Sequence, residues 1–102
     1  NVIGGGNIDG PSAGAAITVC IISALLNKPI RQDLAVTGEI SLRGHIKPVG
    51  GIFEKIYGAR RKGIKLVTVP KDNEKQIPTG LKDIEVKAIS NIEELIQIAL
   101  EQ

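Results

Sequence analysis

The sequence is poor in residues that mark several large classes of protein. It has a single cysteine, which excludes an internal disulfide, and only 2% of its 102 residues are aromatic. The core must therefore be built from isoleucine, valine, leucine and alanine, a mixture that suits helices packed on a sheet. Cys20 lies within an apolar run, where we expect a buried and unreactive thiol.

Low net charge and the lack of a long apolar run argue against two kinds of partner. The formal charge of +2 is too small to favour nucleic acid or an anionic membrane. The apolar stretch at residues 13–26 includes Thr18 and Ser23 and is shorter than the roughly 20 residues of a transmembrane helix. Few aromatic side chains are available to stack on RNA bases. We therefore expect neither nucleic acid nor a membrane as a partner.

The length fits one domain with one hydrophobic core. No internal repeat, low-complexity tract or linker interrupts the sequence. The first residue is asparagine rather than methionine, and the opening residues read as the end of a strand. We interpret residues 1–102 as a single domain from a longer protein.

Strands and helices are expected to alternate along the chain. Helices are predicted at residues 12–26, 52–62 and from 92 onward, and strands at 34–41, 44–49, 64–69 and 84–88. Gly63 should follow the second helix as its C′ residue, and Asp72 should cap a short helix that ends before Pro78. The pattern predicts an α+β fold, an α/β sandwich.

Two of the expected helices carry further signals. The helix at residues 12–26 is apolar on every side, which is typical of a helix enclosed by its domain. The segment Ser90-Asn91-Ile92-Glu93 has the pattern of a capping box. Beyond it lies an apolar stripe that would pack the last helix onto the domain, formed by Ile92, Leu95, Ile96 and Ala99.

The glycine-rich segment at residues 4–14 carries the clearest chemical signal. Its spacing fits a phosphate-binding P-loop, but the position that needs a lysine holds Pro11, which has neither the charge nor an N–H. Residues 10–14 also satisfy the G-x-S-x-G pattern of a nucleophile elbow. That fold needs an acid and then a histidine after the serine, and the only histidine, His45, lies at an expected turn or strand start.

A third interpretation places Ser12 at the start of a helix. Pro11 pre-sets the helical φ angle at the first helical position. Ser12 then lies in the first turn, where unpaired N–H groups and the positive end of the helix dipole would stabilise an oxyanion. The alternative is a serine that only helps to cap a buried helix, and the loop alone does not decide between the two.

A serine nucleophile needs a base, and lysine can serve when its surroundings disfavour the charged form. Lys55 is expected in the first turn of the helix at residues 52–62, where the dipole has that effect. By helical projection it lies beside Ile52 and Ala59 at the border of the apolar face. A lysine in such a helix is more often a surface residue. Other lysines lack this combination of positions, namely Lys28, Lys47, Lys62 and Lys65.

Three motifs, in order along the chain, carry a family resemblance. The first, Asp9-Gly10-Pro11-Ser12-Ala13-Gly14, resembles the nucleophile motif of Lon proteases. The second, Thr37-Gly38-Glu39-Ile40-Ser41-Leu42-Arg43-Gly44, is similar to the family's threonine-glycine-glutamate block. The third, Pro48-Val49-Gly50-Gly51-Ile52-Phe53-Glu54-Lys55, resembles the segment with the catalytic lysine. The likeness runs to about residue 75 and weakens beyond it, and the residues before Gly10 resemble the bacterial Lon-like branch of spore formers.

The resemblance implies a Ser–Lys dyad, with Ser12 as nucleophile and Lys55 as general base. Thr37 matches the family threonine that forms hydrogen bonds in the active site, and it would orient the lysine amine. Asp9 stands where some members have an acidic residue near the nucleophile. The backbone around the serine would form the oxyanion hole, within the loop of Gly10, Pro11 and Ala13. No metal is implied.

The resemblance also implies the activity of an ATP-dependent serine endopeptidase that acts through an acyl-enzyme. The expected fold is that of the Lon proteolytic domain, related to the ribosomal protein S5 domain 2-like fold, with this chain as its C-terminal part. ATP and Mg would belong to an ATPase module that is absent from this chain. Protein substrates, a hexameric homo-oligomer and the cytoplasm are expected, with little activity for the isolated chain. The alternative is a non-catalytic Lon-like scaffold for oligomerisation beside an ATPase.

Overall fold

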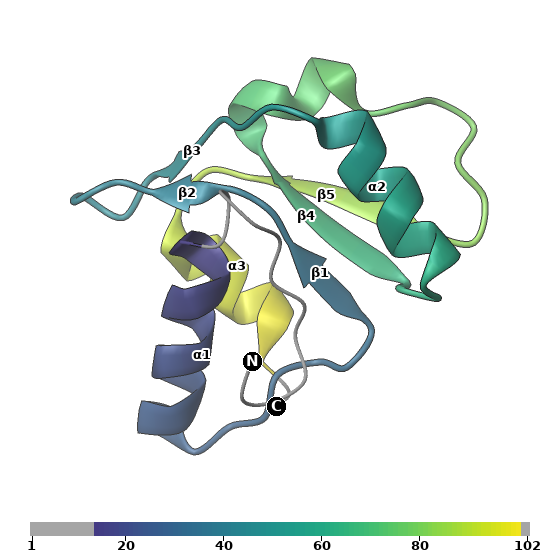
Figure 1. Cartoon of the computed structure of the whole chain (residues 1–102). Coiled ribbons are helices and arrows are strands. Elements are labelled where there is room, and N and C mark those ends of the chain that lie inside the picture. The colour runs from purple at the N-terminus through teal and green to yellow at the C-terminus, as the bar shows by residue number, and fades with distance from the viewer. Residues whose placement is uncertain (1–13, 101–102) are drawn as a thin grey trace.

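Three parallel strands form the centre of the structure, a computed structural model that describes residues 14–100 (Figure 1). In chain order the elements are α1 (Gly14–Leu26), β1 (Leu34–Val36), β2 (Glu39–Ile40), β3 (Ile46–Lys47), α2 (Ile52–Arg61), β4 (Leu66–Pro70), the 3₁₀ helix η2 (Lys71–Gln76), β5 (Glu85–Ile89) and α3 (Ile92–Ala99). The central strands lie in the order β1-β4-β5, while β2 and β3 form a separate antiparallel pair. This arrangement confirms the α+β prediction.

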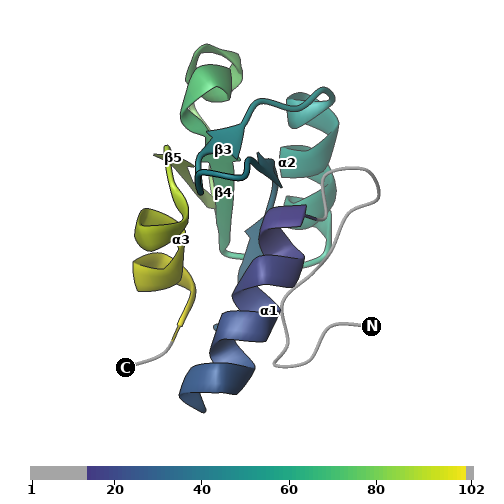
Figure 2. The same ribbon diagram turned by 90° about the vertical axis from the view of Figure 1, so that its left-hand side faces the viewer.

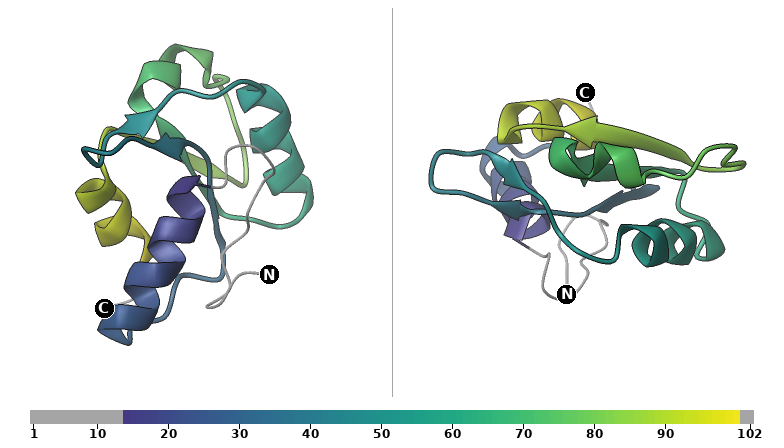
Figure 3. Two further views of the ribbon diagram at one scale, coloured as in Figure 1. Left: turned by 60° about the vertical axis from the view of Figure 1, so that its left-hand side comes forward. Right: turned by 90° about the horizontal axis from the view of Figure 1, so that it is seen from above.

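Helices cover both faces of the central sheet. Successive side chains of a strand point to opposite faces, so the apolar residues of β1 need cover on both sides. Leu34 and Val36 of β1 pack with α1 and α3, whereas Ala35 packs with α2. The register pairs Leu34 with Leu66 and Ala35 with Val67, so β4 continues the same alternation. Figure 2 and the left view of Figure 3 show α1 and α3 on one side of the sheet and α2 on the other.

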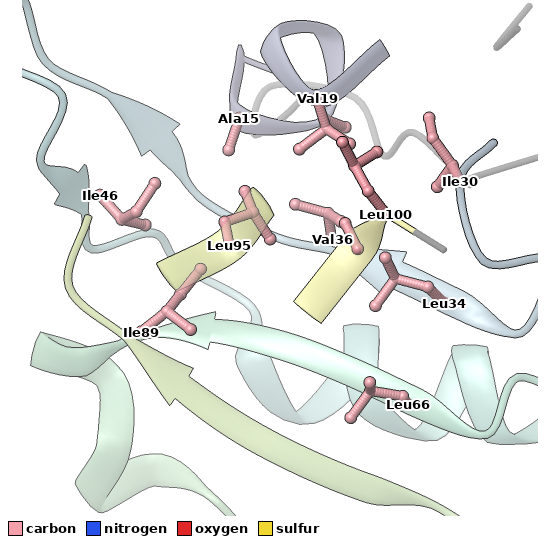
Figure 4. Packing of buried hydrophobic residues seen from close by; sticks show 12 residues of the cluster. Ala15, Val19, Ile30, Leu34, Val36, Ile46, Leu66, Ile89, Leu95 and Leu100 are labelled. Carbon is pink, nitrogen blue, oxygen red and sulfur yellow. The ribbon is translucent and has the colours of Figure 1, made fainter. Parts of the chain in front are cut away.

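The core between the sheet and the pair α1 and α3 is aliphatic, as the composition predicted. Figure 4 shows Ala15 and Val19 of α1 facing Leu95 of α3 and Val36 of β1. Leu95 has no exposed surface. Burying a side chain of this size stabilises the fold by roughly 1.5–3 kcal/mol. Cys20 is half-buried against this cluster rather than fully buried as predicted.

The outer side of α1 is apolar and exposed. Ile17, Ile21 and Leu25, spaced one turn apart, are 48%, 56% and 79% exposed. The prediction that this helix is enclosed on every side is therefore wrong for this chain. A helix without any charged residue gives no sequence signal for which side is covered. Within residues 14–100, no helix is long and apolar enough to cross a membrane.

The strand predicted at residues 34–41 is interrupted at Gly38. This glycine has a φ of +120°, and a Cβ there would lie 2.8 Å from Ile46 Cγ2 and 3.2 Å from Pro70 Cγ. The chain thus leaves β1, turns at Gly38 and forms the short hairpin of β2 and β3. Of the second predicted strand, residues 44–49, only Ile46 and Lys47 form a regular strand, which is β3.

Two of the predicted helix boundaries need correction. Asp72 does not cap η2: the preceding residue is Pro70, no side-chain cap hydrogen bond is formed, and Asp72 lies inside the helix. The cap of α3 differs from the predicted capping box, because the N-cap residue is Asn91 rather than Ser90. Asn91 Oδ1 accepts from the Glu94 backbone N–H, and the Glu94 carboxylate accepts from the Ser90 N–H. The sequence has glutamate at both 93 and 94, so the pattern alone selected the wrong one.

Other boundaries were predicted well. Gly63 follows α2 with a φ of +83°, and its N–H donates to the carbonyl of Arg60 at 3.1 Å, as expected of a C′ glycine. The apolar stripe of α3 also lies where it was predicted. Leu95 and Ala99 are buried, and Ile92 and Ile96 are half-buried against the same core.

Candidate active site

Two of the predicted site residues, Lys55 and Thr37, lie in the described part of the chain. Ser12, Asp9 and the loop residues fall outside residues 14–100, the loop residues being Gly10, Pro11 and Ala13. The structure therefore describes the surroundings of Lys55 and Thr37. His45 lies exposed next to β3, and it does not line the cavity beside Lys55 described below.

Lys55 lies in the first turn of α2, where its N–H donates to the carbonyl of Gly51 at 3.0 Å. Its side chain is half-buried, and the neighbouring Ile52, Ile56 and Ala59 form the buried side of the helix. A Cβ on Gly51 would lie 3.9 Å from Lys55 Cε, so the lysine side chain runs back toward the start of the helix. The predicted border position of Lys55 is confirmed.

A cavity of about 80 Å³ lies beside Lys55, between α2 and β1. Its buried part is apolar and comes from Ala35, Ala59 and Ile64. Lys62 and Glu54 are exposed residues of its lining. The lysine amine thus belongs to a half-buried side chain at the boundary between apolar and charged surroundings.

Thr37 follows β1 directly, two residues after Ala35, which lines the cavity. It is 1% exposed, and both its N–H and its Oγ1 hydroxyl donate to the Thr68 carbonyl, at 3.1 and 2.8 Å. A hydroxyl oxygen also has lone pairs that can accept a hydrogen bond. With its proton directed to Thr68, the Thr37 hydroxyl is oriented as an acceptor for a donor group.

The start of α1 is fixed against the segment that follows Thr37. Ala15 N–H donates to the Gly38 carbonyl at 3.2 Å, and a Cβ on Gly14 would lie 3.6 Å from the backbone nitrogen of Ile40. No acidic residue lies in the first turn of α1. The positive end of the α1 dipole is therefore not neutralised by a side chain of its own first turn.

Asn73 was missed by the sequence reasoning. It lies in η2, among charged and exposed residues, and yet is only 2% exposed. Its Oδ1 accepts from the Val49 N–H and its Nδ2 donates to the Val49 carbonyl, both at 2.9 Å. The asparagine thereby fixes the loop that leads into α2. A single asparagine between aspartate and glutamate reads as surface, so the sequence offered no signal for this contact.

Comparison with known proteins identifies the family. Residues 3–102 match the family described as the Lon protease (S16) C-terminal proteolytic domain. The Lon protease of Vibrio parahaemolyticus is 45% identical over 98 residues, which cover 92% of this chain and 12% of that protein. The Lon protease of Haemophilus influenzae is 47% identical over 97 residues, covering 91% of this chain and 12% of that protein. The Lon protease of Desulforamulus reducens is 46% identical over 96 residues, which cover 90% of this chain and 12% of that protein.

These matches define the chain first as a C-terminal proteolytic domain segment. It belongs to the Lon protease family, as the three motifs predicted. The match continues through the last quarter, where the resemblance had been predicted to weaken. The chain spans about 12% of the length of these relatives.

Proposed function

We propose that this chain is part of the serine endopeptidase domain of an ATP-dependent Lon-type protease, with Ser12 and Lys55 as its catalytic dyad. The observation that carries the proposal is the position of Lys55, half-buried in the first turn of α2 beside a cavity, in a chain of the Lon family. We assign the chain the Lon proteolytic fold, related to the ribosomal protein S5 domain 2-like fold.

In the proposed acylation step, the unprotonated Lys55 amine removes the hydroxyl proton of Ser12 as Oγ attacks a peptide carbonyl carbon. The carbonyl oxygen becomes an oxyanion, which backbone N–H groups of the loop before α1 would stabilise, with help from the helix dipole. The protonated lysine then gives its proton to the leaving amine as the C–N bond breaks. The products of this step are an acyl-enzyme and a free amine.

Water completes the reaction by the reverse proton route. Lys55 takes a proton from the water as its oxygen attacks the ester carbon, and returns that proton to Ser12 Oγ as the ester C–O bond breaks. Thr37 supports both steps by accepting a hydrogen bond from the lysine amine. Asp9 acts as an acidic group near the nucleophile.

One described contact supports this arrangement of the dyad. Gly38 joins the two sides of the site, because its carbonyl accepts from α1 and it directly follows Thr37. The whole enzyme would degrade unfolded or regulatory proteins in the cytoplasm as a hexameric ring. ATP and Mg would act in an ATPase module elsewhere in the full-length protein, and the isolated chain would have little activity.

Covalent labelling of the full-length protein tests the dyad. A fluorophosphonate probe should modify Ser12, as located by mass spectrometry of peptides, and Ser12→Ala should remove the label. Lys55→Ala should slow labelling by on the order of 100-fold or more, since a positioned general base contributes that much.

Lys62→Ala is the matched control, because Lys62 lines the same cavity from the C-cap position directly after α2. It should label within about twofold of the wild type if the lysine acts through its position rather than through its charge. Equal slowing by both substitutions would argue against a specific base. No labelling of Ser12 in a folded ring would favour the oligomerisation scaffold instead.

A further inference from the structure

Asn73 uses both the oxygen and the nitrogen of its amide to hold another segment of backbone. Besides its two bonds to Val49, its Nδ2 donates to Gln76 Oε1 at 3.3 Å. The two bonds to Val49 together imitate the pairing of one strand residue with another. Buried amides that are fully paired in this way fix geometry, because each bond is directional and loss of one leaves a buried group unsatisfied.

Besides Asn73, the packing of Val49 against the apolar cluster of α2 helps to hold this segment, but its backbone has features that leave its path loosely defined. Pro48 has no N–H, Gly51 has a φ of +72°, and α2 begins without a side-chain cap hydrogen bond. Gly50 and Gly51 permit many backbone conformations. Holding Val49 leaves only these two glycines free to vary before the first turn of α2, which carries Lys55.

We propose that Asn73 is a positioning residue for Lys55, acting through Val49 and the start of α2. This inference rests on the proposed function of Lys55 as base. Asn73 itself does not line the cavity, whose lining residues come from β1, α2 and the turn after α2. Its effect is to keep the first turn of α2 formed and in one place.

The test uses the full-length protein with two substitutions of different severity. Asn73→Ala removes both bonds to Val49, whereas Asn73→Asp keeps the acceptor for the Val49 N–H but places a carboxylate against the Val49 carbonyl. The rate constant of fluorophosphonate labelling at Ser12 should fall on the order of tenfold or more in both, since small misplacement of a catalytic group has effects of this size. For a peptide substrate, kcat should fall while KM stays within about twofold.

Two controls separate positioning from loss of folding. Lys71→Ala breaks the exposed Lys71–Glu74 ion pair in the same 3₁₀ helix and should label at the wild-type rate. Asn91→Ala removes a side-chain cap from α3 and lowers stability, and the hydrogen bond that is lost, to the Glu94 N–H, does not involve the loop before α2. In this variant the labelled fraction should fall only as far as the folded fraction falls. The rate constant of labelling at Ser12 should not change.

Hydrogen exchange on the same variants gives a readout that does not depend on catalysis. Amides of residues 49–55 should exchange faster in both Asn73 variants than in either control. Unchanged exchange there, or wild-type labelling rates in both Asn73 variants, would overturn the inference while leaving the dyad intact. Failure of the proposed function is seen separately, as a wild-type protein in which Ser12 is not labelled or Lys55→Ala labels normally.

Discussion

The two faces of the central sheet differ in how they hold their helices. The face under α1 and α3 is aliphatic, and alternation along β4 directs Thr68 to that side. Within residues 14–100, the Thr68 hydroxyl is a buried side-chain group without a hydrogen-bond partner. On the side of α2 the apolar cluster is smaller, and Asn73 beside the helix start pairs both the oxygen and the nitrogen of its amide.

This difference separates the contribution of each face to folding stability from its contribution to the exact position of its helices. Aliphatic packing is strong but has no preferred direction, so it fixes α1 and α3 only as closely as side-chain shapes require. Hydrogen bonds from buried amides and hydroxyls are directional, and they occur next to the helix that carries the proposed base. Substitutions on the two faces should therefore have different consequences, one mainly for folding and the other mainly for rate.

The largest expected effect on stability comes from Gly38, which follows β1 and accepts a hydrogen bond from the first turn of α1. Gly38→Val forces a β-branched residue to a φ of +120° and places its Cβ against Ile46 and Pro70. Backbone strain and overpacking together should lower the free energy of unfolding by about 3–5 kcal/mol. Chemical denaturation followed by circular dichroism measures this. Gly50→Val is the control, because nothing lies within 4 Å of a Cβ there; equal losses would refute the steric argument.

A smaller loss is expected at the cap of α3, on the aliphatic face. Asn91→Ala removes the acceptor for the Glu94 N–H and should cost about 1 kcal/mol of unfolding free energy. Glu94→Ala should also destabilise the helix, because its carboxylate accepts from Ser90. Glu93→Ala should change stability by less than about 0.5 kcal/mol. If Glu93 proved the more costly of the two glutamates, the capping box would begin at Ser90 after all.

On the same face, Thr68→Val should raise stability by about 0.5–1 kcal/mol. The substitution replaces an unpaired buried hydroxyl by a methyl group of similar volume, and burying a polar group without a partner is unfavourable. The backbone carbonyl that accepts from Thr37 is unchanged. The midpoint of thermal unfolding reports the gain. A loss of stability would show that the hydroxyl has a partner in solution, and that the contrast between the faces is weaker than described.

Sequence reasoning recovered the features that depend on local patterns. The helices around Lys55 and Leu95, the glycine after α2 and the family motifs all rest on residues close together in the chain. The contacts of Asn73 and Thr37 rest on partners 24 and 31 residues away, and no local pattern encodes them. The exposed side of α1 was not predicted for another reason. The sequence of a helix that is apolar on every side is the same whether or not all of its sides are covered.

The smallest expected effect is a pH dependence at the start of β1. The hydrogen bond from Arg31 holds the pKa of the Asp33 carboxyl below its ordinary value, with two contacts at 3.0 and 2.8 Å. Because the folded pKa is lowered, the pair stabilises the fold above the unfolded pKa of about 3.9. That contribution is lost as the pH falls through the folded pKa.

The gain should be below about 0.5 kcal/mol, because both side chains are more than a third exposed, at 37% and 38%, and solvent screens them. The free energies of unfolding of wild type and Asp33→Asn should therefore differ slightly at pH 7 and converge as the pH falls through the lowered folded pKa of Asp33. The difference should also shrink in about 1 M salt. A difference that persisted in acid would trace the effect of Asp33→Asn to the turn rather than to the ion pair.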